Sequence, residues 1–60
     1  MRKREALKLH NRDQVEVNVF PHGWIDGYVL GEPREESEKV VVVPVQTSEG
    51  FVEATHTSIR

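Results

Sequence analysis

Side chains that could do chemistry are few in this chain and widely spaced. The histidines at positions 10, 22 and 56 lack the spacing of metal ligands, and the chain contains no cysteine. His56 lies among the hydroxyls of Thr55–Ser58, but neighbours in sequence do not form a nucleophile and a base, so we interpret these groups as partners of the local backbone. The sequence therefore predicts no metal, no cofactor and no enzymatic activity.

Glu16 and Asp26 are a pair of carboxylates that could face each other across neighbouring strands. General acid–base catalysis needs such groups held against a substrate in a pocket. Because the sequence supplies no pocket around this pair, we interpret both residues as solvated side chains.

Aromatic side chains give the best lead to a function. Phe20, Trp24 and Tyr28 flank one turn and fall on the face opposite the aliphatic residues of the same segments. Large aromatics often anchor protein interfaces. We therefore predict a binding surface made of Phe20, Trp24, Asp26 and Tyr28. The alternative is that the rings cover the open end of a thin barrel.

Charge is unevenly distributed, although the formal net charge is only −2. The N-terminal segment is basic through Arg2, Lys3, Arg4 and Lys8, whereas residues 32–38 are acidic. A net acidic chain does not favour broad electrostatic binding to nucleic acid, which requires clustered Lys and Arg. Two interpretations of the basic arm stay open: a solvated tail, or an arm that contacts an anion or the acidic loop of a neighbouring subunit.

These residues must be positioned by β-structure, because apolar and polar residues alternate along much of the chain. Alternation places Val15, Val17 and Val19 on one face of the first run. Short runs bounded by turn residues predict an all-β fold, a small barrel of about five antiparallel strands without a long helix. The runs are Gln14–Phe20, Trp24–Leu30, Lys39–Val45, Phe51–Thr55 and a stub at Ser58–Arg60.

Gly27 and the connection after the second run decide how the strands pair. Asp26-Gly27 is a common hairpin signal, but a turn there leaves only Tyr28–Leu30 as a partner strand. We therefore predict a continuous strand with a bend or bulge at Gly27. Residues 31–38 are the longest polar connection, in which Pro33–Glu36 could form one helical turn.

The run Val40–Val45 is apolar on both faces. Such a strand is covered on both sides, and a chain of 60 residues has little material to cover both. We therefore predict that Val40 and Val42 contact another chain in a homo-oligomer. Pro44 has no N–H, which places it near a strand end, an edge or a bulge.

The order of these segments resembles the Src-homology-3-like (SH3-like) small β-barrels. The residues that carry the resemblance are Asp13-x-Val15-x-Val17, Gly23-Trp24-x-x-Gly27-x-Val29, the valine strand, Val52 and Thr57-Ser58-Ile59-Arg60. The resemblance covers residues 9–60 and implies one barrel domain, with residues 1–8 as a basic N-terminal arm outside it. Tudor, Agenet and KOW modules share this plan, as does the plasmid-encoded type II dihydrofolate reductase.

Two members of this group imply specific functions. Resemblance to Tudor modules implies an aromatic cage that holds a methylated ammonium group by cation–π attraction. Residues four apart on a strand are about 13 Å apart, so this cage requires a bend between Trp24 and Tyr28. Resemblance to the reductase implies a pore lined by Val-Gln-Ile-Tyr, but the matching residues are Val52-Glu53-Ala54-Thr55. Symmetric copies of Glu53 would repel an anionic dinucleotide, so we predict no reductase activity.

The predicted function is a non-catalytic binding or assembly module whose partners are its own copies and another protein or peptide. The alternative is a nucleic-acid-binding barrel that uses the arm Arg2–Lys8, and a third hypothesis is a small-molecule or nucleotide site in the pore of a homo-oligomer. No apolar run approaches the roughly 20 residues of a membrane span, and the N-terminus lacks the apolar stretch of a signal peptide. We therefore expect a cytoplasmic protein with no membrane partner.

Overall fold

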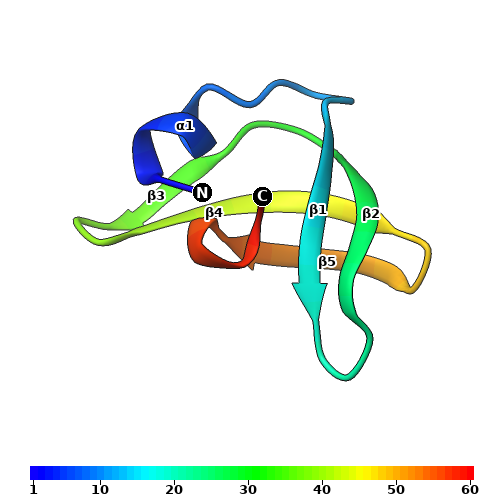
Figure 1. Ribbon diagram of the computed structural model, residues 1–60. Helices are drawn as coiled ribbons and strands as arrows, with labels where there is room; N and C mark the ends of the chain where they lie inside the picture. Colours follow the sequence, from blue (N-terminus) through cyan, green and yellow to red (C-terminus); the bar gives the residue numbers. More distant parts are fainter.

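The computed structural model describes all 60 residues and consists mainly of strands (Figure 1). All strand pairs are antiparallel, and the longest helix has 5 residues. The predicted all-β fold of about five short strands is therefore confirmed. In chain order the elements are α1 (Lys3–Leu7), β1 (Gln14–Val19), β2 (Gly23–Val29), β3 (Arg34–Ser37), β4 (Val40–Thr47), β5 (Gly50–Thr55) and the 3₁₀ helix η1 (His56–Ser58).

β4 is the centre of the sheet because it pairs with β2, β3 and β5. β2 pairs with residues 45–47 of β4 and β3 with residues 40–42. β5 pairs with residues 42–47 of β4, along its opposite edge. β1 pairs with β2, and this hairpin crosses the β4–β5 hairpin steeply (Figure 1). The chain end closes the far side: Val17 forms a bridge with Ile59, and the main chains of Glu16 and Arg60 exchange hydrogen bonds of 2.8 and 2.9 Å. The sheet is therefore curled and barrel-like.

Alternate residues of these strands fill a single core. Val15 and Val17 are buried, and Val19 is partly buried against the same cluster, so the alternation predicted for β1 is confirmed. The other inward-facing residues come from every part of the chain. The buried cluster consists of Ala6, Val15, Val17, Val29, Val41, Val43, Val45, Ala54 and Ile59.

β2 runs through Gly27 without a turn, as predicted from strand length, but the predicted bulge is absent because the register continues unbroken through this residue. Gly27 pairs with Val15 on one side and with Thr47 on the other. A Cβ atom at this position would lie 2.7 Å from Cγ1 of Val45 and 2.8 Å from the carbonyl oxygen of Gln46. Glycine is needed here because β2 approaches β4 too closely for a side chain.

The polar connection predicted at residues 31–38 contains a strand, and the helical turn that Pro33–Glu36 could have formed is absent. Residues Arg34–Ser37 form β3, and all its side chains are exposed. They pair with residues 40–42 of β4, with an irregular register between Glu35 and Ser37. A strand without buried positions shows no apolar alternation, and here its structure comes from the ladder with β4 rather than from its own sequence.

Pro44 lies inside β4, although the sequence predicts it near an end, an edge or a bulge. It falls between the two ladders on one edge of β4, because the β2 ladder ends at Val45 and the β3 ladder begins at Val42. The carbonyl of Pro44 accepts a hydrogen bond of 2.9 Å from the N–H of Leu30. The missing N–H therefore faces the gap between β2 and β3, where it costs no ladder bond.

The predicted final strand Ser58–Arg60 is shorter than expected. η1 takes up His56–Ser58, and Ile59 forms an isolated bridge to Val17. Ile59 is nevertheless completely buried, so the end of the chain completes the core.

Residues 1–8 pack against the sheet. α1 is too short to be stable alone, but its Ala6 is completely buried in the core. The Met1 nitrogen donates a hydrogen bond of 2.8 Å to the carbonyl of Ile59, and Nζ of Lys3 donates one to the carbonyl of Glu38. The basic segment thus contacts the acidic segment of its own chain. Neither α1 nor η1 has the length and apolar character that crossing a membrane requires.

Candidate binding surface

A row of side chains crosses the outer face of the sheet from β1 to β5. Direct cross-strand partners lie on the same face of a sheet. The register links them in the order Gln14, Tyr28, Gln46 and Phe51. Tyr28 is 45% exposed and Phe51 is 54% exposed. The row therefore presents two aromatic rings and two amides to solvent.

Tyr28 lies between two shallow hollows that differ in charge. One hollow is lined by Asn11, Arg12, Gln14, Tyr28 and Leu30, and the other includes Gln14, Asp26, Tyr28 and Gln46. Neither Arg12 nor Asp26 forms an ion pair within the chain. An exposed ring flanked by unpaired charges of opposite sign suits a charged partner. We refer to Arg12, Gln14, Asp26, Tyr28, Gln46 and Phe51 as the Tyr28 face.

Trp24 shares this side of β2, but the chain itself covers its ring. The guanidinium carbon of Arg60 lies 4.1 Å from the centre of the indole ring. Nε of Arg60 also donates a hydrogen bond of 3.1 Å to Oε1 of Glu16. Arg60 therefore occupies the place that a ligand cation would take over this ring, which argues against a Tudor-like cage at Trp24.

Phe20 lies apart from both other rings. It belongs to the turn after β1 rather than to the strand, and it is 94% exposed. It lines a third hollow, together with residues of β1 and β5. The structure therefore divides the predicted surface: Asp26 and Tyr28 share a hollow, Trp24 is stacked against Arg60, and Phe20 stands alone at the end of the hairpin.

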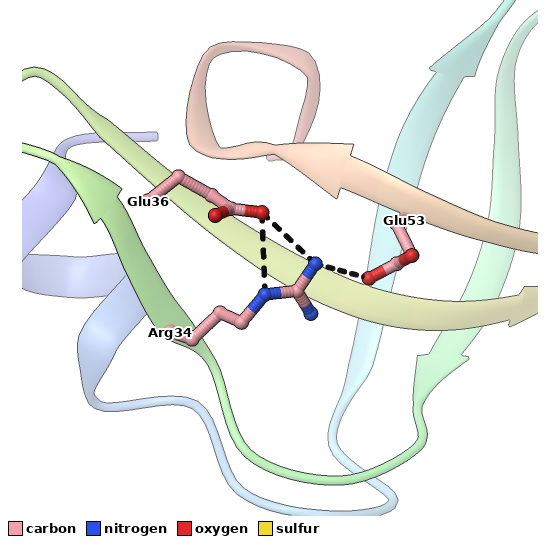
Figure 2. A network of polar contacts seen from close by, with 3 residues as sticks. All are labelled: Arg34, Glu36 and Glu53. Carbon is pink, nitrogen blue, oxygen red and sulfur yellow. Dashed lines mark hydrogen bonds and ion pairs between the residues drawn. The ribbon is translucent and has the colours of Figure 1, made fainter.

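Val42, predicted to contact another chain, is covered within its own chain. It alternates with the core residues Val41 and Val43, so it faces outward, yet it is only 7% exposed. Its cross-strand partner on β3 is Arg34, whose guanidinium reaches across β4 to Oε2 of Glu53 at 2.5 Å (Figure 2). The Arg34 side chain therefore lies across the outer face of β4 near Val42. The outer face at Val42 needs no other chain to cover it, while a contact through the half-buried Val40 stays a prediction.

Two carboxylates hold Arg34 in this position. Nε and Nη2 of Arg34 donate hydrogen bonds of 3.3 and 3.0 Å to Oε1 of Glu36, in addition to the contact with Glu53 (Figure 2). The hydrogen bond with Glu53, followed by that with Glu36, raises the pKa of Arg34 above its usual value. All three side chains are about half exposed, so the network fixes the position of Arg34 more than it stabilises the fold.

The carboxylates that could have served catalysis have other partners or none. Glu16 faces Asp26 across β1 and β2, as expected, but Glu16 forms an ion pair with Arg60. His56 accepts a hydrogen bond of 3.3 Å through Nδ1 from the N–H of Val41, so its ring joins η1 to β4.

The other two histidines form local pairs. His10 lies 3.8 Å from Asp13, and Nε2 of His22 lies 3.3 Å from Oε1 of Glu49, which links the β1–β2 turn to the β4–β5 turn. No group of three or more His, Asp or Glu side chains is placed to hold a metal ion.

No family model, curated protein or solved structure matches this chain. The resemblance to SH3-like barrels stays a prediction that rests on the order of the segments.

Sequence reasoning missed part of the Tyr28 face, namely Arg12, Gln14, Gln46 and Phe51. Alternation along each strand could have placed Gln14 and Phe51 outward. Gln46 joins the row through the register between β2 and β4, which single-strand patterns do not reveal. Arg12 has a φ of 78°, a left-handed conformation that glycine adopts far more readily than arginine.

Proposed function

We propose that the protein is a non-catalytic assembly module that binds a second copy of itself through the Tyr28 face. The observation that carries this proposal is the exposed Tyr28 ring between the unpaired charges of Arg12 and Asp26. Exposed aromatics supply the binding energy of many interfaces, while charges around them determine which partner binds and in which register.

Two-fold symmetry explains how this face would recognise its own copy. In an isologous interface every contact occurs twice, with the two residues exchanged between subunits. Arg12 would meet Asp26 of the partner subunit, and the reverse pair would form on the other side of the axis. Gln14 and Gln46 carry both donors and acceptors, so each amide can bond to an identical amide. The Tyr28 face is therefore complementary to itself in charge and in hydrogen bonding.

The proposal includes an SH3-like architecture. It is supported by the two crossed hairpins, the 3₁₀ helix after β5 and the final bridge from Ile59 back to β1. Because a small barrel of this type serves many unrelated functions, the binding proposal rests on the Tyr28 face and not on the fold.

Charge reversal tests the proposed self-association. Asp26→Arg and Arg12→Asp should each weaken the dimer in sedimentation equilibrium by about fivefold or more, because each places like charges together. The double variant should restore association, since the two pairs are then re-formed with exchanged signs. Aspartate tolerates the left-handed conformation of residue 12, so Arg12→Asp keeps the backbone.

The matched control is Glu32→Arg, which makes the same change in net charge at an exposed site outside the Tyr28 face. It should leave association unchanged. The proposal would be contradicted if the double variant associated no more tightly than the single variants. It would also be contradicted if Glu32→Arg weakened association as much as Asp26→Arg does.

Nucleic-acid binding through the arm Arg2–Lys8 is the second candidate. Arg4 and Lys8 are exposed and form no ion pair within the chain, so both are free to contact phosphates. Binding of this kind weakens steeply with salt, and Arg4→Glu combined with Lys8→Glu should abolish retention on single-stranded and double-stranded DNA at low salt. Absence of retention by the parent protein at low salt would remove this candidate.

A further inference from the structure

One edge of β5 has no strand partner. β5 pairs with β4 alone, and β1 meets Ile59 rather than β5. In an antiparallel ladder the main-chain groups of successive residues point alternately toward and away from the partner strand. Pro44, which lies opposite Glu53, turns its carbonyl to Leu30 and away from β5. The main-chain groups of Glu53 therefore also point away from β4, toward the free edge.

The main-chain groups of the residues two positions before and two positions after Glu53 have the same orientation. Phe51 and Thr55 thus present their N–H and C=O groups to the same edge. β5 carries neither Pro nor Lys, the residues that commonly block the pairing of an edge strand. The edge therefore offers a free set of alternating donors and acceptors.

The third hollow, which Phe20 lines, forms a groove beside this edge, between the end of β1 and β5. Its apolar lining consists of Val17, Val19, Phe20, Val52 and Ala54, and its polar lining of Asn18, Glu53, Thr55 and Ser58. Phe20, the most exposed large apolar side chain of the protein, is part of this lining. An apolar lining with polar groups around it is typical of a binding site for another chain.

We propose that the free edge of β5 binds an extended peptide segment of another protein as an additional strand. Main-chain hydrogen bonds to an edge give such complexes their affinity, and pockets for alternate side chains give them specificity. Peptide side chains on the inner side would meet Val19, Val52 and Ala54 and must be apolar. Peptide side chains on the outer side would lie beside Glu53.

Charge indicates which outer residue the peptide carries. Glu53 is the charged residue in the lining of the groove, and its carboxylate, which contacts Arg34 through Oε2, can accept further hydrogen bonds. The site therefore fits a segment in which apolar residues alternate with polar ones that include a Lys or Arg. This site does not overlap the Tyr28 face except at Phe51, so the inference does not depend on the proposed self-association.

The test uses the full chain labelled with ¹⁵N and the capped hexapeptide Thr-Val-Lys-Val-Thr-Val. We expect the amide signals of Phe51, Glu53 and Thr55 to shift and their hydrogen exchange to slow when the peptide is added. A control peptide of the same sequence, methylated on the nitrogens that face β5, keeps every side chain but loses those donors and should not bind. Tyr28→Ala should bind the first peptide as the parent does, which separates this result from the proposed self-association.

Charge reversal at the edge gives a second readout that does not depend on folding effects. Glu53→Lys should weaken binding of the lysine peptide by about two- to fivefold and strengthen binding of a matching glutamate peptide by the same factor. No shifts at millimolar peptide would overturn the proposal, as would shifts confined to the Tyr28 face or equal binding of the methylated control. Changes at the β5 edge that follow protein concentration alone would show that a second copy, and not a peptide, occupies the edge, and would overturn it too.

Discussion

Trp24 and Tyr28 lie on the same outer face of the same strand, four residues apart, but their surroundings differ. Arg60 stacks on Trp24 at 4.1 Å, and Glu16 holds Arg60 in place. Tyr28 is 45% exposed between two charges that have no partner in the chain. Arg60 of the same chain covers the Trp24 ring, whereas the Tyr28 ring stays exposed. An aromatic on an outer face is therefore a candidate contact only where the protein's own side chains do not cover it.

The valine strand shows the same contrast. Val42 faces outward but lies near Arg34, which Glu53 and Glu36 hold across β4. Two arginines thus cover outer apolar groups, one at the end of the chain and one on β3. The exposed rings of Tyr28, Phe51 and Phe20 have no such cover, and they lie at the surfaces that we assign to binding.

Gly27 lies between Trp24 and Tyr28 in the sequence of β2, and replacing it has the largest expected effect on stability. Gly27→Ala should lower the free energy of unfolding by about 1–3 kcal/mol, because the new methyl group meets Val45 and Gln46. Urea denaturation measures this change. Gly23→Ala is the control: its φ of 77° disfavours alanine, but no atom lies within 4 Å of the new Cβ. A Gly27→Ala variant as stable as the parent protein would mean that the close approach of β2 and β4 does not limit residue 27.

Removing the covered ring should have a smaller effect. Trp24→Ala should cost about 1–2 kcal/mol, since it removes a half-buried ring and its cation–π contact. Arg60→Gln should cost about 0.5–1 kcal/mol by losing the same contact. A double-mutant cycle measured by thermal unfolding should show that the two losses are not additive. Strict additivity would mean that Arg60 and Trp24 do not interact, and the contrast between the rings would lose its basis.

Removing the Arg34 side chain should raise the exposure of Val42 but change the free energy of unfolding only slightly. Arg34→Ala removes the side chain that crosses β4, so the Val42 methyl groups should become accessible to a soluble paramagnetic agent in NMR. Arg34→Met keeps an unbranched apolar side chain and should preserve the protection. If Val42 stays protected in Arg34→Ala, another group covers it.

Patterns within one strand could be predicted from the sequence, and contacts between distant residues could not. The inward valines of β1 and the continuous strand through Gly27 follow from alternation and strand length. β3 was hidden because all its side chains are exposed, and its pairing is visible only beside β4. The cover of Trp24 by Arg60 joins residues that are far apart in the sequence, and no local pattern reports such a contact. The outer residues Asp26 and Tyr28 were placed on the correct face, but the charge that completes their surface comes from Arg12 in an unusual backbone conformation.

Sedimentation equilibrium of Tyr28→Ala beside Trp24→Ala tests the central claim most directly. The account predicts that Tyr28→Ala is monomeric at micromolar concentration while its unfolding free energy stays within about 0.5 kcal/mol of the parent value, as expected for a surface substitution. It predicts that Trp24→Ala is less stable but associates as the parent does. The opposite result, with Tyr28→Ala associating normally and a folded Trp24→Ala protein that is monomeric, would contradict the assignment of the contact surface to Tyr28.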